Sequence, residues 1–467
     1  MNTKQLCELI KKSITKFITE ENTVNLKDSV LKSGVFYSVN DAVMSAREAF
    51  KRYSKLKLNE RREIIEVIKQ RLLPEAQIIA HMVCEETGMG NEKDKTEKMI
   101  WAIKKTPSVE DLVTDVKTDD DGMTLYELSP YGVVCAIHPS TNPCATLVNN
   151  TISALAAGNA IIHCPHPRAC KVSNYVTEII SSAIRDVCGI DNLVVTVEKC
   201  SMAVTKEIMT HPDVALVVAT GGTGILSEAI TCGKKMIGGG SANPVAIVDE
   251  TANISKAARD IVDGASFDNN LMCTSEKNIV AVNSIADKLI EEMLKNGAYY
   301  IHTQEEMLKL TAAVITQDFT ANKLLRGKSA NELLNKAGIK CSHEIRLIVV
   351  DTIKQHPFVT NELLMPIIPL VRVIDFETAL ETALEIEQDM RHTSTIHSQS
   401  IEHLNRAAKE MQTAVFVKNG PSYAGLGFRN DGETSFTVAA VTGEGTVTAR
   451  HFARKRKCVL VGGFSIR

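Results

Sequence analysis

The chain has 467 residues, of which 44% are hydrophobic and 4% aromatic, and its formal net charge is −3 at pH 7. This length predicts two or three domains with sizeable cores, and the near-neutral charge and scarce aromatic residues argue against nucleic acid or an anionic membrane as partner. The 12 cysteines form no CxxC pair or zinc-ligand spacing, and no bilayer-spanning run or signal peptide is evident, which favours a cytoplasmic protein with reduced thiols and no metal.

The first 20 residues predict a short amphipathic helix. Leu6, Ile10, Ile14 and Phe17 recur at three- and four-residue spacing, with charged residues over much of the rest. A helix this short is marginal alone and needs a surface for its apolar stripe. That surface is its own oligomer, a membrane, or a groove on a partner protein, and the glutamates and the lack of Trp in this segment weaken the membrane alternative.

Residues 21–39 are loosely patterned and predict a linker. From Asn40 to about residue 90, apolar residues at helical spacing predict a series of helices, interrupted at Pro74 and ended at Gly88. The polar stretch 119–122 then predicts a turn in an exposed ribbon.

Beyond Tyr131 strands and helices alternate. The strands predicted in a first unit span 132–137, 160–164, 193–197 and 214–219, and those in a second unit span 245–248, 279–282, 347–350, 370–374 and 414–417. This alternation predicts an α/β fold with doubly wound parallel sheets covered by helices on both faces. Because ligands bind at the carboxyl ends of such strands, the loops at 139–143, 165–168 and 220–224 are candidate binding loops.

The turn Thr220-Gly221-Gly222-Thr223-Gly224 directly precedes a predicted helix. It is not a full GxGxxG motif, and a turn before a helix needs glycine whether or not it holds phosphate. Amides at a helix N-terminus nevertheless form an anion site, so the turn is a candidate for binding a pyrophosphate.

Cys273 differs from the other cysteines in its surroundings. Cys135, Cys164 and Cys458 lie in apolar stretches, where cysteine packs as a small core residue. Cys273 follows the polar, turn-forming segment 266–270, from which a thiol could reach a cleft. A thiolate that attacks an aldehyde forms a thiohemiacetal, which is well placed to release hydride. From spacing alone, core packing is the default for Cys273 and a catalytic nucleophile is the alternative.

Phe267-Asp268-Asn269-Asn270 leading to Cys273 resembles the nucleophile segment of the CoA-acylating branch of the aldehyde dehydrogenase superfamily. Three further stretches follow in the family's order. Pro139-Ser140-Thr141-Asn142-Pro143 is similar to the loop whose Asn helps to form the oxyanion hole, Asn361-Glu362-Leu363-Leu364-Met365-Pro366 to the segment whose Glu holds the nicotinamide ribose, and residues 442–461 to the closing segment. The match spans about residues 41–461, and the most similar group is the microcompartment-linked propionaldehyde and butyraldehyde dehydrogenases.

The resemblance implies an aldehyde dehydrogenase-like α/β fold with a Rossmann-type cofactor domain, an α/β catalytic domain that carries the nucleophile, and a β-ribbon for oligomerisation. The expected boundaries are a helix at 1–20, a linker at 21–39, the cofactor domain at 40–240 with 110–130 in the ribbon, the catalytic domain at 241–436, and a C-terminal oligomerisation segment at 437–467.

The resemblance also implies the roles of single residues. Cys273 is the expected nucleophile, and Asn142 with the backbone amide of Cys273 is expected to stabilise the oxyanion, with NAD and coenzyme A as cofactors. The expected cofactor-binding residues are Pro139, Ser140, Thr141, Pro165, His166, Pro167, Thr220, Gly221, Gly222, Thr223, Gly238, Gly239, Gly240, Glu362 and Leu364.

Two departures from the wider superfamily refine this expectation. Hydrolytic members carry a Glu before a Gly-Gly pair, where it activates water, but this chain has Ile237 before Gly238-Gly239-Gly240. Without that base a better nucleophile, the CoA thiol, must release the acyl group. The three glycines would leave room for its pantetheine arm, or form only a tight interdomain crossing. His166 stands where many members have Lys, which favours NAD over NADP, although a lone His is often structural.

The expected function is therefore oxidation of a short-chain aldehyde to its acyl-CoA by a homo-oligomer, dimer or tetramer, inside a bacterial microcompartment. The N-terminal helix is expected to dock onto shell proteins, as in related enzymes of that group. The alternatives are a hydrolytic aldehyde dehydrogenase that releases the free acid, disfavoured by the missing Glu, and a non-catalytic assembly component, disfavoured by the presence of Cys273, Asn142 and Glu362.

Overall fold

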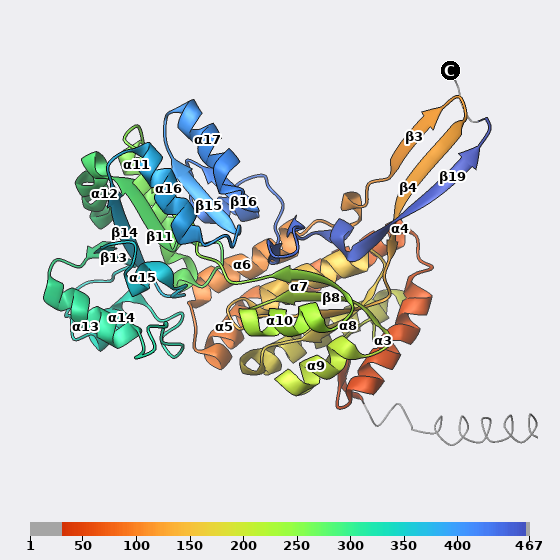
Figure 1. The fold of residues 1–467 in the computed structure, drawn as a ribbon. Coiled ribbons are helices and arrows are strands. Elements are labelled where there is room, and N and C mark those ends of the chain that lie inside the picture. The colour runs from red at the N-terminus through yellow and green to blue at the C-terminus, as the bar shows by residue number, and fades with distance from the viewer. Residues whose placement is uncertain (1–29, 464–467) are drawn as a thin grey trace, which may run out of the picture.

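The computed structural model describes residues 30–463, which form two lobes and a projecting ribbon (Figure 1). The predicted N-terminal helix at 1–20 lies outside the described residues. None of the helices between residues 30 and 463 is long and apolar enough to cross a membrane.

The cofactor lobe is built on a seven-stranded sheet in the order β1-β2-β7-β6-β5-β8-β9, parallel except for the β1–β2 pair. Its strands are β1 (Val30–Lys32), β2 (Val35–Phe36), β5 (Val133–Ile137), β6 (Ala160–Cys164), β7 (Val194–Val197), β8 (Val214–Thr220) and β9 (Lys235–Gly239). Its helices are α3 (Val39–Tyr53), α4 (Leu58–Leu72), α5 (Ala76–Thr87), α6 (Glu92–Lys105), α7 (Pro143–Ala156), α8 (Cys170–Cys188), α9 (Met202–Thr210) and α10 (Thr223–Thr231), with 3-10 turns η1 (Val109–Asp111) and η2 (Pro167–Ala169).

The catalytic lobe carries a second seven-stranded sheet, entirely parallel, in the order β12-β13-β14-β11-β10-β15-β16. Its strands are β10 (Val245–Val248), β11 (Asn278–Val282), β12 (Ala298–Tyr300), β13 (Leu347–Asp351), β14 (Ile367–Val373), β15 (Thr393–His397) and β16 (Val415–Lys418). Its helices are α11 (Ile254–Ser266), α12 (Asn283–Lys295), α13 (Gln304–Val314), α14 (Ala330–Lys336), α15 (Pro357–Thr360), α16 (Phe376–Glu387) and α17 (Ile401–Met411), with 3-10 turns η3 (Phe267–Asn270) and η4 (Ser422–Leu426).

The ribbon is a three-stranded antiparallel sheet in which β4 (Gly122–Pro130) lies between β3 (Asp115–Asp119) and β19 (Ala453–Val461). The turn predicted at 119–122 joins β3 to β4. Short strands β17 (Val438–Ala439) and β18 (Gly445–Thr446) and the 3-10 turn η5 (Ala449–Phe452) precede β19. The predicted α/β architecture with parallel sheets is thus confirmed.

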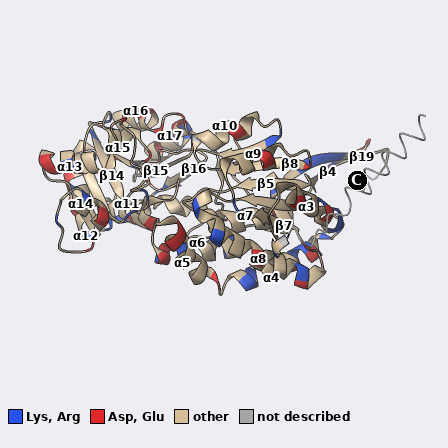
Figure 2. Cartoon of the chain, turned by 90° about the horizontal axis from the view of Figure 1, so that it is seen from below, with Lys and Arg blue, Asp and Glu red and all other residues tan. Residues whose placement is uncertain are grey.

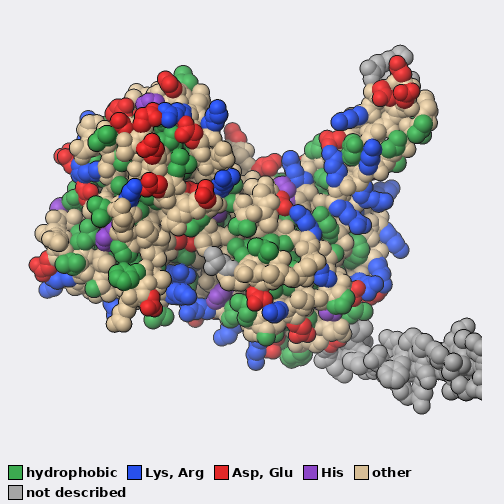
Figure 3. Space-filling view, viewed as in Figure 1, with side chains coloured by type: hydrophobic (Ala, Val, Ile, Leu, Met, Phe, Trp, Pro, Cys, Tyr) green, Lys and Arg blue, Asp and Glu red, His purple; other side chains and the backbone are tan. Residues whose placement is uncertain are grey.

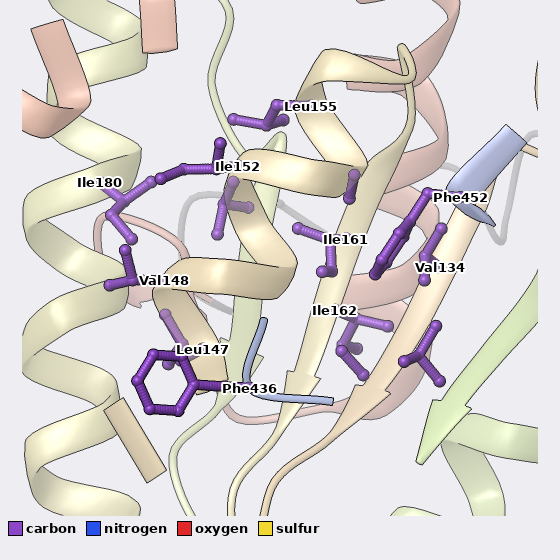
Figure 4. Packing of buried hydrophobic residues seen from close by; sticks show 14 of the residues in the cluster. Val134, Leu147, Val148, Ile152, Leu155, Ile161, Ile162, Ile180, Phe436 and Phe452 are labelled. Atoms are coloured by element: carbon purple, nitrogen blue, oxygen red, sulfur yellow. The ribbon is translucent and has the colours of Figure 1, made fainter. Parts of the chain in front are cut away.

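Two of the predicted boundaries differ from the structure. Residues 30–36, placed in a linker, form β1 and β2, because β2 extends the cofactor sheet beside β7 and buries Val35 and Phe36. Phe436, placed in the catalytic domain, belongs to the core of the cofactor lobe, where it lies beside Leu147 of α7 while Phe452 lies near Ile161 of β6 (Figure 4). The C-terminal segment therefore completes the cofactor core before it reaches the ribbon.

Helix α6 belongs to the cofactor lobe but lies between the two lobes, as Figure 2 shows from below. Its Trp101 packs on Phe428 and Phe267 of the catalytic lobe, with ring centroids 3.6 and 6.0 Å apart. Phe267 in turn packs on Tyr423 of η4 at 5.7 Å. This aromatic cluster fixes α6 against the segment that leads to Cys273.

Candidate active site

A sharp reversal of the backbone brings Cys273 out of the α11 helix. Asp268, Asn269 and Asn270 follow the end of α11 with φ of 47°, 54° and 65°. Three successive non-glycine residues in this left-handed region carry strain of order 1–3 kcal/mol each, so the surroundings must hold them there. Cys273 lies just beyond this turn, half-buried, ahead of β11.

The side chain of Asp268 holds the turn against α6. It is fully buried, and its Oδ1 accepts a hydrogen bond from the backbone N–H of Asn91 at 3.0 Å. Its Oδ2 accepts from Lys95 Nζ at 3.0 Å and also from Lys98 Nζ. Lys98 additionally donates to Oδ1 of Asn142. One ammonium group thus connects the nucleophile turn with the predicted oxyanion residue.

Lys277 supports the turn from the other side. Its buried Nζ donates to the backbone oxygens of Asn270 and Met272 at 2.8 and 3.0 Å, and to Asn270 Oδ1 at 2.6 Å. Burial lowers the pKa of Lys277 to about 8, while the nearby Glu362 and Cys273 counteract this shift. A cationic group therefore lies close to the thiol of Cys273.

The pKa of Cys273 is raised to about 11, first by burial and then by the charge of Glu362. Lys277 and the N–H groups of Cys273 and Thr274 oppose this rise. The thiol is consequently mainly protonated at neutral pH in the absence of ligands, and only a small fraction is thiolate. The N–H of Cys273 is also the backbone donor expected in the oxyanion hole.

The predicted binding loops meet at the carboxyl edge of the cofactor sheet. The chain runs outward from β5 to β6 and β7 on one side and then returns to β8 and β9 on the other. The loop after β5 and the loop after β8 therefore flank the switch point of the sheet. The first of these loops contains Pro139, Ser140 and Thr141. Ligands of doubly wound sheets bind at such a point.

Helix α10 begins at this switch point. Its N-cap Gly222 is exposed and provides no side-chain cap, so the N–H groups of the first turn are available for a phosphate. Gly221 and Gly222 form the turn, and the hydroxyl of Thr220 hydrogen-bonds Thr437 Oγ1 at 2.8 Å. The role of the backbone from Thr220 to Thr223 in binding a dinucleotide pyrophosphate stays a prediction.

The loop after β6 carries the second predicted contact. Pro165 is buried, Pro167 is exposed, and His166 caps η2 by accepting the N–H of Arg168 on Nδ1 at 3.1 Å. Burial and the charge of Arg168 lower the pKa of His166, so its imidazole is neutral. His166 therefore has a structural role, as the cap of η2. Its contact with an adenosine ribose stays a prediction.

Gly238 and Gly239 are the last residues of β9, and Gly240 directly follows it. The sequence pattern did not predict this strand. Gly239 lies against the backbone of Val438, since a Cβ there would come within 2.6 Å of its oxygen. Gly238 and Gly240 face Leu226 of α10. Ile237, which directly precedes the glycine run, is fully buried and apolar. A close backbone approach accounts for Gly239 without a cofactor.

Glu362 and Leu364 lie in the loop before β14. Leu364 is buried with φ of 56°, and its oxygen accepts the N–H of Gly327 at 2.8 Å. The oxygen of Gly327 accepts from Asn269 Nδ2 of the nucleophile turn at 2.8 Å. Burial raises the pKa of Glu362, which Lys277 and Arg326 oppose. This loop is thereby tied to the nucleophile turn, and Glu362 lies near Cys273.

The aldehyde dehydrogenase family model matches residues 34–427. The chain belongs to the aldehyde dehydrogenase family. It is 45% identical to the CoA-propanoylating propanal dehydrogenase of Citrobacter freundii over the full length of both chains. The predicted family resemblance is confirmed.

Solved structures extend this aldehyde dehydrogenase assignment. Rhodopseudomonas palustris propionaldehyde dehydrogenase with bound CoA and an acylated cysteine superposes with a TM-score of 0.91 at 46% identity, covering 93% of this chain and 99% of that one. An engineered glycolyl-CoA reductase with bound NADP+ has a TM-score of 0.92 at 45% identity, covering 94% and 100%. The propionaldehyde dehydrogenase from the fucose utilisation microcompartment of Clostridium phytofermentans has a TM-score of 0.91 at 41% identity, covering 93% and 100%.

Several residues of this aldehyde dehydrogenase site were not predicted from the sequence. Lys95 and Lys98 fall three residues apart in α6, a pattern that ordinarily indicates a solvated face, yet both are buried against Asp268. Lys277 and Glu276 directly follow the nucleophile segment and are also buried. Between residues 30 and 463 no group of three or more His, Cys, Asp or Glu side chains could hold a metal ion.

Proposed function

We propose that this aldehyde dehydrogenase oxidises a short-chain aldehyde such as propionaldehyde to its acyl-CoA, with NAD as oxidant and CoA as acyl acceptor. The observation that carries the proposal is the joint presence of Cys273 just beyond its strained turn and of the segment 237–241, which contains no carboxylate. The relatives named CoA-propanoylating, and the neighbour with bound CoA and an acylated cysteine, support the same product.

The first half of the reaction takes place on Cys273. Its sulfur, once deprotonated, attacks the aldehyde carbon, and the resulting oxyanion accepts hydrogen bonds from the N–H of Cys273 and from Asn142 Nδ2. Each such donor commonly stabilises the transition state by roughly 3–4 kcal/mol. Bound NAD supplies the hydride acceptor. The residues that would hold it are the backbone of Thr220–Thr223, the loops at 139–141 and 165–167, and the carboxylate of Glu362.

The second half transfers the acyl group from Cys273 to CoA. The acyl thioester on Cys273 should not be hydrolysed quickly, because the segment 237–241 provides no carboxylate to activate water. The CoA sulfur attacks the acyl carbon and the Cys273 thiolate leaves, so one thioester replaces another at nearly constant free energy. The free energy of aldehyde oxidation is then retained in the acyl-CoA product.

The test is NADH production from propionaldehyde with and without CoA, with identification of the product. Without CoA, the enzyme should form at most one equivalent of NADH per active site, and CoA should convert this burst into steady turnover to propionyl-CoA. Sustained turnover to propionate without CoA would assign the chain to the hydrolytic branch instead.

The choice of NAD over NADP rests on His166. A neutral imidazole can hydrogen-bond a ribose hydroxyl but offers less charge than lysine to a 2′-phosphate. His166→Lys should therefore increase kcat/KM for NADP relative to NAD.

The cellular setting is also a proposal, supported by the neighbour from a microcompartment. We place the enzyme in the bacterial cytoplasm, inside such a compartment, with residues 1–20 as the segment that docks on shell proteins. We also propose a homo-oligomer that pairs through the ribbon. Strand β19 is an edge strand and exposes Val459, Leu460 and Val461 as well as a basic run at 454–457, near the Lys and Arg side chains at the ribbon base in Figure 3.

A further inference from the structure

Asn142 occupies the N-cap position of α7, but its side chain does not cap the helix. An Asn at this position ordinarily accepts the N–H of the second or third helical residue through its side-chain oxygen. Here the φ and ψ of Asn142 are −137° and 53°, and its Oδ1 accepts a hydrogen bond from Lys98 Nζ instead. The N-terminus of α7 therefore lacks a side-chain cap, and the Asn142 amide is instead held by Lys98, 44 positions earlier in the chain.

Lys98 determines which end of this amide is free. An ammonium group has three donors and no acceptor, so the Asn142 atom that faces it must be the carbonyl oxygen. The Nδ2 group is consequently turned away from Lys98. Among residues 30–463 its recorded contact is a long one, 3.5 Å to Thr141 Oγ1. Nδ2 thus keeps hydrogen-bonding capacity for a ligand.

The ammonium of Lys98 is itself fixed. Lys98 is 2% exposed, and it shares Oδ2 of the fully buried Asp268 with Lys95. Burial lowers the pKa of Lys98 to about 8, an effect that Asp268 opposes. Asp268 lies five residues before Cys273 in the nucleophile turn. Lys98 therefore joins the Asn142 amide to the turn that carries the nucleophile.

We propose that Lys98 is a positioning residue that orients Asn142, so that Nδ2 rather than Oδ1 faces the aldehyde oxygen held on Cys273. This inference rests on the proposed function, and in particular on Asn142 as an oxyanion donor. Lys98 does not contact the substrate in this scheme and acts through the amide. An Asn142 released from Lys98 can flip or return to capping α7, and either change removes one donor from the oxyanion.

The experiment measures the rate of the first NADH burst with propionaldehyde in the absence of CoA, for Lys98→Met, Asn142→Ala and the double variant. Loss of an oxyanion donor commonly costs a hundredfold to a thousandfold, so Asn142→Ala and Lys98→Met should each slow the burst by about that range. Because Lys98 acts through Asn142, the double variant should be no slower than Asn142→Ala alone, within about threefold.

Lys95→Met is the matched control. It removes a second buried ammonium from the same oxygen of Asp268, but Lys95 otherwise donates at 3.4 Å to the backbone oxygen of Thr141 and not to the Asn142 amide. The Lys95→Met variant should lose about as much thermal stability as Lys98→Met. Its first NADH burst should be slower than in the wild-type enzyme by less than about tenfold. Alkylation of Cys273 by iodoacetamide needs no oxyanion hole, and in Lys98→Met its rate should stay within about twofold of the wild-type rate.

The possible outcomes separate the inference from the function beneath it. If Asn142→Ala keeps the wild-type burst rate, Asn142 is not the oxyanion donor, and both the site assignment and the inference fail. If Asn142→Ala is slow but the effects of the two single changes multiply in the double variant, Lys98 acts independently of Asn142 and only the inference fails. Equal slowing by Lys95→Met and Lys98→Met would show that both lysines serve only to hold Asp268. That result would also overturn the inference.

Discussion

Lys277 Nζ donates a hydrogen bond to the backbone oxygen of Met272 at 3.0 Å, one residue before the nucleophile. The same ammonium also lies near the carboxylate of Glu362, which raises the pKa of Cys273 while Lys277 lowers it. Cys273 therefore experiences two nearby groups of opposite charge, the buried Lys277 and the partly exposed Glu362. Their balance, together with burial, determines the fraction of thiolate available for attack.

Removing the charge of Lys277 and removing the charge of Glu362 should change the reactivity of Cys273 in opposite directions. With a pKa of about 11, the thiolate fraction at pH 8 should be about a hundredfold smaller than for an ordinary thiol of pKa near 9. Because a more basic thiolate is also more nucleophilic, alkylation by iodoacetamide should be slower by about tenfold. Lys277→Met removes the cation and should slow alkylation further, by about tenfold, whereas Glu362→Gln should accelerate it by a similar factor. The measurement is mass spectrometry of the Cys273 peptide over time, without ligands.

The control for these variants is Lys309→Met, which removes a surface lysine paired with Glu305 and should leave the alkylation rate unchanged. Faster alkylation alone does not make Glu362→Gln a better enzyme, since its carboxylate is also the proposed ribose contact and its NADH burst should be slower. Shifts of the same sign in Lys277→Met and Glu362→Gln would contradict the electrostatic account.

Cys273→Ser should abolish detectable aldehyde oxidation, because the hydroxyl is a far weaker nucleophile than a thiolate, while the melting temperature stays within about 2 °C. Cys135→Ala provides the contrast. Cys135 is fully buried in β5, with its Sγ 3.6 Å from that of Cys164, so its truncation should cost roughly 1 kcal/mol of folding free energy and leave kcat unchanged. Steady NADH production by Cys273→Ser would refute the nucleophile assignment.

The sequence pattern predicted the parallel sheets because most of their strands are short apolar runs between helices. It failed at β15, where Thr393, Ser394 and Thr395 are buried and polar. Ser394 Oγ pairs with Thr413 Oγ1 at 2.9 Å and Thr393 Oγ1 with His392 Nδ1 at 2.9 Å, so these two hydroxyls are satisfied although hydrophobicity alone would place them at the surface. It also failed at β9, since glycine is depleted in strands and Gly239 is explained only by the neighbouring backbone of Val438.

The same distinction applies to the site. Cys273 and Asn142 were predictable because short local motifs surround them. Lys98 was not, because a lysine in an amphipathic helix resembles any solvated lysine until its partners are known. Those partners lie 44 and 170 positions away in the sequence, at Asn142 and Asp268. The first contact depends on how α6 packs on the loop before α7 and the second on how the two lobes pack, and neither leaves a periodic pattern in the chain.

Deletion of residues 1–20 tests the proposed targeting segment, which lies outside the described residues. The truncated enzyme should keep its NADH and acyl-CoA rates, since the site is assembled from residues far along the chain, but it should no longer co-purify with microcompartment shells. Fusing residues 1–20 to an unrelated fluorescent protein should transfer shell association to it. Loss of activity or of the oligomer on truncation would instead assign the segment to the enzyme fold.

Glu276 should make the stability of the enzyme depend on pH. Its carboxylate is fully buried and accepts from the backbone N–H and the Oγ of Ser422, both at 2.7 Å. Burial raises the pKa of Glu276 from 4.5 to about 7, against the opposing effect of these hydrogen bonds and of Lys277. The folded protein therefore binds this proton more tightly than the unfolded chain, and the associated stability is fully present below pH 4.5 and is lost as the pH rises through 7.

The size of this effect follows from the shift of the Glu276 pKa, which sets an upper limit of about 3 kcal/mol between pH 4.5 and pH 8. Denaturant unfolding of the wild-type enzyme and of Glu276→Gln at pH 5, 6.5 and 8 measures it. Glu276→Gln carries no titrating carboxyl, so its stability should fall less over this range. Ser422→Ala, which removes a hydrogen bond that favours the ionised form, should make the fall steeper than in the wild-type enzyme. Parallel pH profiles for wild type and Glu276→Gln would show that Glu276 is already ionised in the folded protein at pH 5.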